Sequence, residues 1–377
     1  MPEDDAQPTT TMSEYEVRNA PSIGVCADST DAVKCFARVL TDEYGQARAN
    51  LAPPPSSFTA AQLRSFYGIT SQGSNTKTVA IVDANAYPRA LTDVNQYRSM
   101  NGIPALANCS TGTHPCLAVS TQSGAAFDLG WAQETALDLD MVSAMCPQCN
   151  ILLVQGSTAS FNALAAAENT AASSTLTGSK AVAISNSYGG GEAGSTSFAA
   201  AYNHAGVAIT VSSGDSAFAA GPQFPATAPT VIAVGGTSMF PGSIPREKVW
   251  SGAGSGCSTL YAKPSWQHDT GCSKRMEADV SAVADPNTGV QVVAPTSASA
   301  NGLFVFGGTS VAAPLIAGII GNVGTGIAPS FPYAHTGNLF DITSGNNGSC
   351  SPAYLCTGVV GYDGPTGLGS PIGPGAF

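Results

Sequence analysis

Between residues 306 and 314 the chain reads Phe306-Gly307-Gly308-Thr309-Ser310-Val311-Ala312-Ala313-Pro314. Two glycines and a threonine precede Ser310, and the apolar segment Val311–Ile320 that follows is typical of a buried helix. Glycines allow a tight turn, and a helix N-terminus presents free backbone N–H groups and the positive end of its dipole. Ser310 is therefore a candidate nucleophile, placed where a developing oxyanion would be stabilised. The alternative is an ordinary packing turn before a helix.

A serine nucleophile needs a neighbouring base, and the candidates lie upstream in the predicted helix Trp131–Met145. Glu134 and Asp138 are four residues apart, so in a helix their carboxyl groups lie on the same face and can meet. Like charges this close share a proton and raise one pKa, which gives a base suited to mildly acidic solution. The alternative is a solvated acidic helix face, which the surrounding Ala, Leu and Met residues disfavour because carboxylates are costly among them.

A third carboxylate, Asp215, closes the run Val211-Ser212-Ser213-Gly214-Asp215, which follows an apolar segment. If this carboxyl is kept protonated, it can donate a hydrogen bond to a developing oxyanion, a role that improves as the pH falls. An equally open alternative is that Asp215 only turns or caps the chain.

Short apolar runs rich in β-branched residues alternate with longer helical segments along the chain. The runs are Thr78–Asp83, Asn150–Val154, Ala181–Ser185, Val207–Val211 and Thr230–Val234. Because they are apolar on both faces, they predict an α/β fold with a doubly wound, mostly parallel sheet and helices on both faces. Functional residues of such sheets gather at the carboxyl ends of strands, where this chain places Asp83, Ser187-Tyr188-Gly189 and Ser213-Gly214-Asp215.

The chain has 377 residues, of which only 10% are charged, and 25 Asp and Glu residues stand against 14 Lys and Arg residues. Ion pairs are therefore few, and the Ser, Thr, Asn, Gln and Gly residues that replace them do not titrate, so the composition favours stability in acid. A net charge of −11 without a basic cluster argues against a nucleic-acid partner. No apolar run reaches 18 residues, so no membrane span is predicted.

The ten cysteines fall as five couples that are close in sequence. They are Cys26 with Cys35, Cys109 with Cys116, Cys146 with Cys149, Cys257 with Cys272, and Cys350 with Cys356. An even, locally paired set predicts disulfides and a secreted, extracellular protein. The alternative for Cys146-Pro147-Gln148-Cys149 is a redox or metal site, which its position after a helix and the lack of a second zinc-type pair disfavour.

Residues 1–56 are predicted to be an N-terminal extension that ends in a linker. The linker contains Pro53-Pro54-Pro55, which continues neither a helix nor a strand, so a domain boundary is expected there. Thr59 then has the position of a helix N-cap. Residues 57–377 are predicted to form one domain. Residues 1–20 lack the basic and apolar parts of a signal peptide, so any targeting segment is expected outside this chain.

In this order, the Glu134-x-x-x-Asp138 helix, the Ser212–Asp215 turn and the Gly307–Pro314 segment resemble the sedolisin family of serine-carboxyl peptidases. These are acid-active relatives of the subtilisin fold, and the resemblance covers residues 57–377. It implies that Ser310 is the nucleophile, Glu134 the general base and acid, Asp138 its orienting partner and Asp215 the oxyanion-hole donor.

Strand-end residues supply the other candidates of this resemblance. Ser187, Tyr188, Gly189 and Gly214 are the candidates for substrate binding. Some members of the family carry a Glu and a Trp linked to the orienting Asp. Here Asp83 and Tyr188 stand in those places, so Asp83 is the candidate outer partner and the proton network can differ.

Two further segments, Asp341–Asn346 and Gly361–Pro371, resemble the family's calcium loop. The resemblance implies a Ca²⁺ ion held by the carboxylates of Asp341 and Asp363 and by backbone carbonyls of Ile342, Val359 and Gly361. Oxygen ligands of this kind suit calcium. Without the family, the same residues form only a glycine-rich turn with two acids.

The resemblance implies a secreted, acid-active peptidase that is a monomer, acts on proteins or peptides and is made with a propeptide that serves as inhibitor and chaperone. Residues 1–56 are too short for a complete prodomain, so the resemblance implies an N-terminal extension or a propeptide remnant, with a processing site near Ala52 to Ser57. One alternative is a subtilisin-type Asp/His/Ser peptidase, but none of His114, His204, His268 and His335 begins a His-Gly-Thr helix. The other is a catalytically inactive calcium-binding protein on the same fold. Endopeptidase and tripeptidyl-peptidase action both remain open.

Overall fold

The computed structural model describes residues 20–26, 29, 31–42, 44–47, 49 and 57–377. The processing site that we expected near Ala52 to Ser57 lies, apart from Ser57, outside the described residues.

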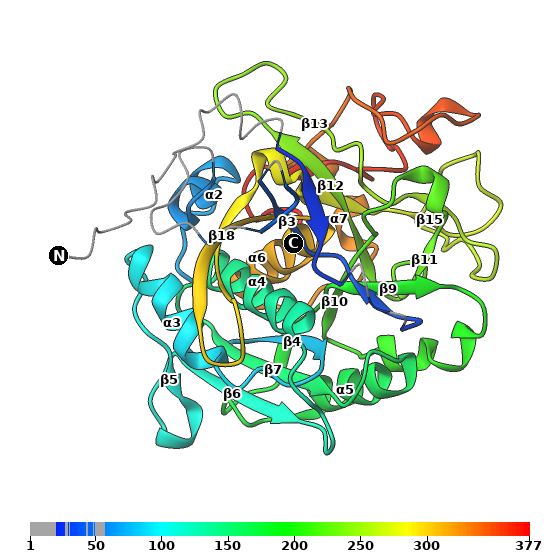
Figure 1. Cartoon of the computed structure of the whole chain (residues 1–377). Helices are drawn as coiled ribbons and strands as arrows, with labels where there is room; N and C mark the ends of the chain where they lie inside the picture. Colours follow the sequence, from blue (N-terminus) through cyan, green and yellow to red (C-terminus); the bar gives the residue numbers. More distant parts are fainter. Residues whose placement is uncertain (1–19, 27–28, 30, 43, 48, 50–56) are drawn as a thin grey trace.

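A nine-stranded sheet runs through the centre of the molecule (Figure 1). Eight strands follow the order β13-β12-β10-β8-β4-β7-β6-β5, and β16 also pairs with β12. The strands are β4 (Thr78–Ala84), β5 (Ala107–Asn108), β6 (Cys116–Thr121), β7 (Asn150–Gly156), β8 (Ala181–Asn186), β10 (Ala208–Ser212), β12 (Ile232–Met239), β13 (Glu247–Val249) and β16 (Val280–Val283). Only the β12–β13 pair of this sheet is antiparallel among the described residues. The predicted α/β fold with a mostly parallel sheet is confirmed.

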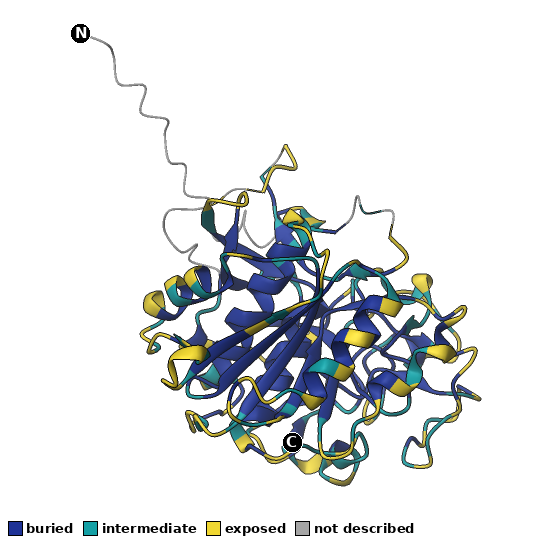
Figure 2. Ribbon diagram, turned by 90° about the horizontal axis from the view of Figure 1, so that it is seen from below, coloured by how far each residue is buried: buried dark blue, intermediate teal, exposed yellow. Residues whose placement is uncertain are grey.

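Helices cover both faces of this sheet (Figures 1 and 2). They are α2 (Ala60–Phe66), α3 (Ala90–Met100), α4 (Leu129–Met145), α5 (Phe161–Ser173), α6 (Thr309–Val323) and α7 (Phe331–Ala334). Strand β4 shows why two layers are needed, since its side chains alternate between two cores. Val79 and Ile81 join the core that contains α4 and α6, whereas Ala80 and Val82 join the core that contains α5.

Helix α6 approaches both α4 and β4 very closely because glycines occupy the contact positions. A Cβ atom added at Gly318 would lie 2.7 Å from the Cβ of Met145, at the end of α4. One added at Gly321 would lie 2.2 Å from a methyl carbon of Val79. Side chains at either position would force the elements apart, so the glycines set the spacing of the layer.

The described part of the N-terminal extension packs against the domain. Strands β1 (Ser22–Gly24) and β3 (Arg38–Leu40) extend a four-stranded antiparallel sheet with β18 (Asn301–Gly307) and β17 (Val290–Pro295). Strand β2 (Lys34–Cys35) pairs instead with β9 (Tyr188–Gly191), whose other neighbour is β11 (Gln223–Phe224). Two short pairs complete the strands: β14 (Gly256–Cys257) with β15 (Met276–Glu277), and β19 (Leu339–Phe340) with β20 (Ser370–Pro371).

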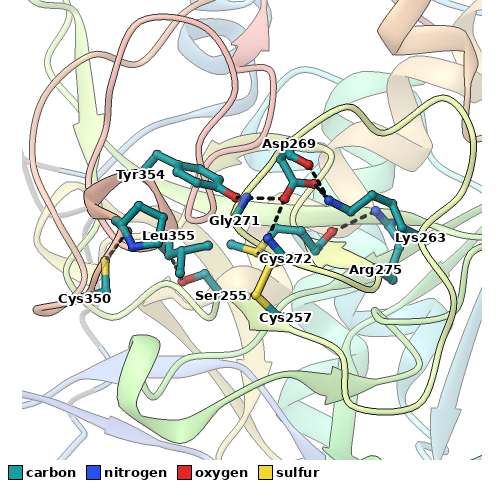
Figure 3. The surroundings of a disulfide bond; sticks show 12 residues. Ser255, Cys257, Lys263, Asp269, Gly271, Cys272, Arg275, Cys350, Tyr354 and Leu355 are labelled. Carbon is teal, nitrogen blue, oxygen red and sulfur yellow. Dashed lines mark hydrogen bonds and ion pairs between the residues drawn. A yellow bond between two sulfur atoms is a disulfide. The ribbon is translucent and has the colours of Figure 1, made fainter.

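All ten cysteines lie in the described residues and form the five predicted disulfides. Figure 3 shows how the Cys257–Cys272 loop is fixed by Asp269. This carboxylate accepts hydrogen bonds from the Cys272 N–H at 3.1 Å and the Tyr354 hydroxyl at 2.8 Å, and it forms an ion pair with Lys263 at 2.9 Å.

Within the described part of the chain, none of the helices combines the length and the apolar character that crossing a bilayer requires.

Candidate active site

Strand β18 leads directly into the turn that presents Ser310. Gly308 has φ of +94°, a conformation that L side chains rarely adopt, and α6 begins at the next residue. The fully buried Ser310 is the second residue of that helix. Its Oγ donates a hydrogen bond to Glu134 Oε2 at 2.9 Å. The candidate nucleophile is therefore paired with a carboxyl group.

Helix α4 carries Glu134 and Asp138 on the face that meets Ser310, and both are fully buried. Glu134 Oε2 accepts a second hydrogen bond, from the Ala37 N–H at 2.8 Å. Asp138 Oδ1 accepts a hydrogen bond from the Ser187 hydroxyl at 2.7 Å. Burial raises the pKa of both carboxyls well above the usual range, and the negative charge of Asp83 raises both further.

Asp83, at the end of β4, completes the group. It is fully buried, and neither of its carboxyl oxygens has a hydrogen-bond partner among the described residues. Burial raises the pKa of Asp83 to about 7. Three fully buried carboxyls that repel one another cannot all be ionised, so Asp83, Glu134 and Asp138 hold shared protons in acid.

Asp215 follows β10 and faces the start of α6. Its Oδ1 accepts hydrogen bonds from the Thr309 N–H at 2.7 Å and the Thr309 hydroxyl at 2.9 Å. Burial raises the pKa of Asp215 to about 7, although these hydrogen bonds and the charge of Arg38 lower it. Because Oδ1 is occupied as an acceptor, the proton of the neutral acid belongs on Oδ2, which has no partner among the described residues. Asp215 can thus donate an O–H in acid.

The predicted substrate-binding residues divide into backbone and side-chain roles. Gly189 and Gly214 line a cavity of about 250 Å³ beside Asp215. Ser187 uses its hydroxyl on Asp138, while its carbonyl accepts a hydrogen bond from Ser310 Oγ at 3.3 Å. Tyr188 is fully buried and its hydroxyl donates to Asn186, so only its backbone is available to a ligand.

No imidazole takes the position of the base. The hydrogen-bond acceptors for Ser310 Oγ are Glu134 and the carbonyl of Ser187. His114 lies instead against Asn150, and His335 against the Phe331 carbonyl. This geometry does not support an Asp/His/Ser triad.

Two groups of contacts were missed by reasoning from sequence. One is the link from Ser187 to Asp138, which joins residues 49 positions apart. The other is the segment around Phe36 and Ala37, which crosses the site. The sequence does carry a signal for this segment. From Val33 to Val39, apolar residues partly alternate with longer polar residues, as in a strand with one buried face.

The two halves of the predicted calcium loop meet in the structure. Asp341 Oδ2 accepts a hydrogen bond from the Gly361 N–H at 2.8 Å, and Asp363 accepts one from the Val359 N–H at 3.3 Å. The other oxygen of Asp341 is buried and has no partner among the described residues. The part of the chain that the structure describes contains no group of three or more His, Cys, Asp or Glu side chains able to hold a metal. Two carboxylates with nearby carbonyls fit a hard cation such as Ca²⁺ in chemistry.

Comparison with known proteins identifies the family of the chain. The subtilase family model matches residues 117–330, more than half of the chain. The chain is 34% identical to kumamolisin of Bacillus sp. (strain MN-32) over 200 residues, which cover 45% of this chain and 35% of kumamolisin. It is 32% identical to sedolisin of Pseudomonas sp. (strain 101) over 173 residues, which cover 39% of this chain and 28% of that protein. The matches thus span about a third of the length of these relatives.

A solved structure extends the likeness of fold over most of the chain. Pseudomonas sedolisin in complex with two molecules of pseudo-iodotyrostatin matches with a TM-score of 0.69 and 24% identity, covering 87% of this chain and 96% of that one. The chain therefore belongs to the subtilase family, and its relatives within that family are the sedolisins.

Proposed function

We propose that this protein is an acid-active serine-carboxyl peptidase that hydrolyses peptide bonds in proteins or peptides. One observation carries the proposal: Ser310 Oγ donates a hydrogen bond to Glu134 inside a buried group of carboxyls. A serine hydroxyl becomes a nucleophile only when a positioned base removes its proton. The match to kumamolisin and sedolisin supports the same conclusion.

In the proposed reaction, Ser310 Oγ attacks the carbonyl carbon of the substrate while Glu134 takes the hydroxyl proton. The O–H of Asp215 and the first free N–H groups of α6 stabilise the oxyanion. Glu134 then gives its proton to the leaving amine, and water hydrolyses the acyl-enzyme with Glu134 again acting as the base. Asp138, held by Ser187, orients Glu134, and Asp83 tunes the charge of the pair.

The proposed roles of Asp215 as hydrogen-bond donor and of Glu134 as base together predict activity in acid. Asp215 works only as a neutral acid, and its pKa of about 7 means that it loses its proton as the pH rises through neutrality. Glu134 must be able to accept a proton, so activity falls again in strong acid once the carboxyl group is fully protonated.

We also propose that Ca²⁺ binds at Asp341 and Asp363 together with the carbonyls of Ile342, Val359 and Gly361. The ion would neutralise the two carboxylates and hold the two loop segments together, which makes its role structural. The five disulfides fit a secreted protein whose peptidase domain is residues 57–377.

The test is hydrolysis of a denatured protein at pH 3 to 5 by the wild type, Ser310→Ala and Glu134→Ala, each checked for folding by circular dichroism. Cleavage by the wild type with both variants inactive is the expected result. Equal cleavage by all three would assign the activity to another site, and a folded but inactive wild type would favour a non-catalytic protein.

A further inference from the structure

Residues 33–38 of the chain itself run through the proposed active site. Strand β2 pairs antiparallel with β9, with Lys34 opposite Gly189 and Cys35 opposite Tyr188. The next residue continues the pairing, because the Phe36 N–H donates to the Ser187 carbonyl at 3.2 Å. An extended peptide added to a sheet edge beside a nucleophile is bound in the way a protease binds its substrate.

Phe36 lines the cavity of about 250 Å³ together with Gly189 and Gly214. A Cβ atom at Gly189 would lie 2.8 Å from the tip of the phenyl ring, and one at Gly214 would lie 3.8 Å from it. The tip of the ring therefore lies close to two glycines, whose missing side chains leave room for it. This pocket fits a bulky apolar side chain on the amino side of the bond that Ser310 would attack.

The peptide group between Phe36 and Ala37 meets the catalytic groups at both of its ends. The Ala37 N–H donates to Glu134 Oε2 at 2.8 Å, and the same oxygen accepts the hydrogen bond of Ser310 Oγ. A Cβ atom at Gly308 would lie 1.9 Å from the Phe36 carbonyl oxygen and 2.6 Å from Asp215 Oδ2. The Phe36 carbonyl oxygen and Asp215 Oδ2 therefore both lie next to Gly308. Asp215 Oδ2 has no hydrogen-bond partner among the described residues.

Contacts on both sides of this bond fix its position. The disulfide ties Cys35, just before Phe36, to Cys26. The adjacent Val25 N–H donates to the Ala37 carbonyl at 3.0 Å, and β3 continues into the sheet with β18. The bond therefore lies in a small ring that is closed by one disulfide and one hydrogen bond, which holds it in a single register.

We propose that the bond between Phe36 and Ala37 is a self-cleavage site of this chain, an inference that rests on the proposed function. Ser310 Oγ would attack the Phe36 carbonyl carbon and pass its proton to Glu134. Glu134 would return that proton to the Ala37 nitrogen as the C–N bond breaks, which leaves Phe36 esterified to Ser310 and Ala37 as a free amine. Water would then release the Phe36 carboxyl group and regenerate Ser310. Until this cut is made, residues 33–38 exclude other substrates.

The experiment incubates the full chain at pH 4 and follows the mass of the denatured protein and the sequence of any new N-terminus. The wild type should gain an N-terminus at Ala37, at a rate that does not depend on protein concentration, and Ser310→Ala should gain none. Denaturing detection matters because β1 pairs with β3, beyond the cut, and can retain the released segment. Truncation of the ring in Phe36→Ala should slow the cut about tenfold or more, since burial of an aromatic side chain contributes about 1.5–3 kcal/mol.

Phe36→Leu should keep most of the rate because it still fills the pocket. Ile23→Ala is the matched control. Ile23 lies in β1, in the same N-terminal extension as Phe36, and it is 44% exposed. A wild type that digests a denatured protein but forms no Ala37 terminus would overturn this inference and leave the proposed function intact. A folded wild type that does neither would overturn both. A cut that Phe36→Ala and Ile23→Ala slow equally would also overturn the assignment of the pocket.

Discussion

Ser310 Oγ and Glu134 Oε2 lie 2.9 Å apart, although 176 residues separate them in the chain and both are fully buried. The contact joins the first turn of α6 to the first half of α4. Both partners project from rigid helices that pack on the same face of the sheet, so the pair is preorganised and does not depend on a mobile loop.

We expect Glu134→Gln and Ser310→Ala to lower kcat by about a thousandfold or more, because each removes one member of the nucleophile and base pair. The matched control is Glu168→Gln. Glu168 is also a fully buried helical glutamate, but it lies on α5 in the other core. Initial rates on a peptide substrate at pH 4 measure the effect. A Glu134→Gln variant as active as Glu168→Gln would exclude Glu134 as the base.

For Asp215→Asn we expect a change in the pH profile. The wild type should lose activity above about pH 7, where a carboxyl with this pKa ionises and can no longer donate a hydrogen bond. Asparagine donates an N–H at every pH, so the alkaline limb should move to higher pH, whereas Asp215→Ala should lose about 100-fold or more throughout. Profiles of kcat/KM from pH 3 to 9 test this, and an unchanged alkaline limb in Asp215→Asn would refute the donor role.

Stability should fall as the pH rises from about 4 to 7, in part because of Asp83. Its pKa is raised from 3.8 to about 7 in the folded protein, so the folded state keeps a proton that the unfolded state loses. The protective effect is complete below the unfolded pKa and is lost as the pH rises through the folded pKa. The rise from 3.8 to about 7 corresponds to roughly 4 kcal/mol, since one pKa unit equals 1.36 kcal/mol.

Asp83→Asn should remove that part of the pH dependence. Urea unfolding at pH 4 and pH 7, with constant calcium, measures the free energy of unfolding of each variant. The exposed Asp31→Asn serves as the control. If Asp83→Asn and Asp31→Asn lose the same stability between the two pH values, Asp83 is not the group responsible.

Chelation should destabilise the protein if Ca²⁺ holds the loop of Asp341 and Asp363. A bound ion at a hundred times its Kd stabilises the folded state by about 2.7 kcal/mol, so EGTA should lower Tm by several degrees. Asp341→Asn should have a lower Tm that EGTA no longer changes. Added Ca²⁺ should restore the wild-type Tm and Mg²⁺ should not, because Mg²⁺ requires a smaller and more rigid site. A wild-type Tm that is insensitive to EGTA would rule out this ion.

The sequence was sufficient to predict the sheet and the helix that carries two carboxyls on one face, because both depend on local patterns. The runs Thr78–Asp83 and Asn150–Val154 became β4 and β7, since strands that are apolar on both faces need a layer on each side. Glu134 and Asp138 are four residues apart, and a helix brings such residues to one face.

Contacts set by the relative placement of distant strands could not be predicted in this way. Ser187 reaches Asp138 because β8 lies beside β4 in the sheet, a choice of neighbour that no local pattern encodes. The passage of Phe36 and Ala37 through the site depends on the antiparallel register of β2 against β9. The alternation from Val33 to Val39 indicates a strand but does not indicate its partner.

The close packing at Gly318 has a consequence for catalysis at a distance. Gly318 lies eight residues beyond Ser310 on α6, about 12 Å along the helix axis, and it faces the end of α4. A methyl group there would force α6 and Met145 apart. Because α6 also carries Ser310, we expect this displacement to lengthen the distance between the Ser310 hydroxyl and Glu134. An apolar contact with no chemistry of its own would thus control the alignment of the proposed reacting atoms.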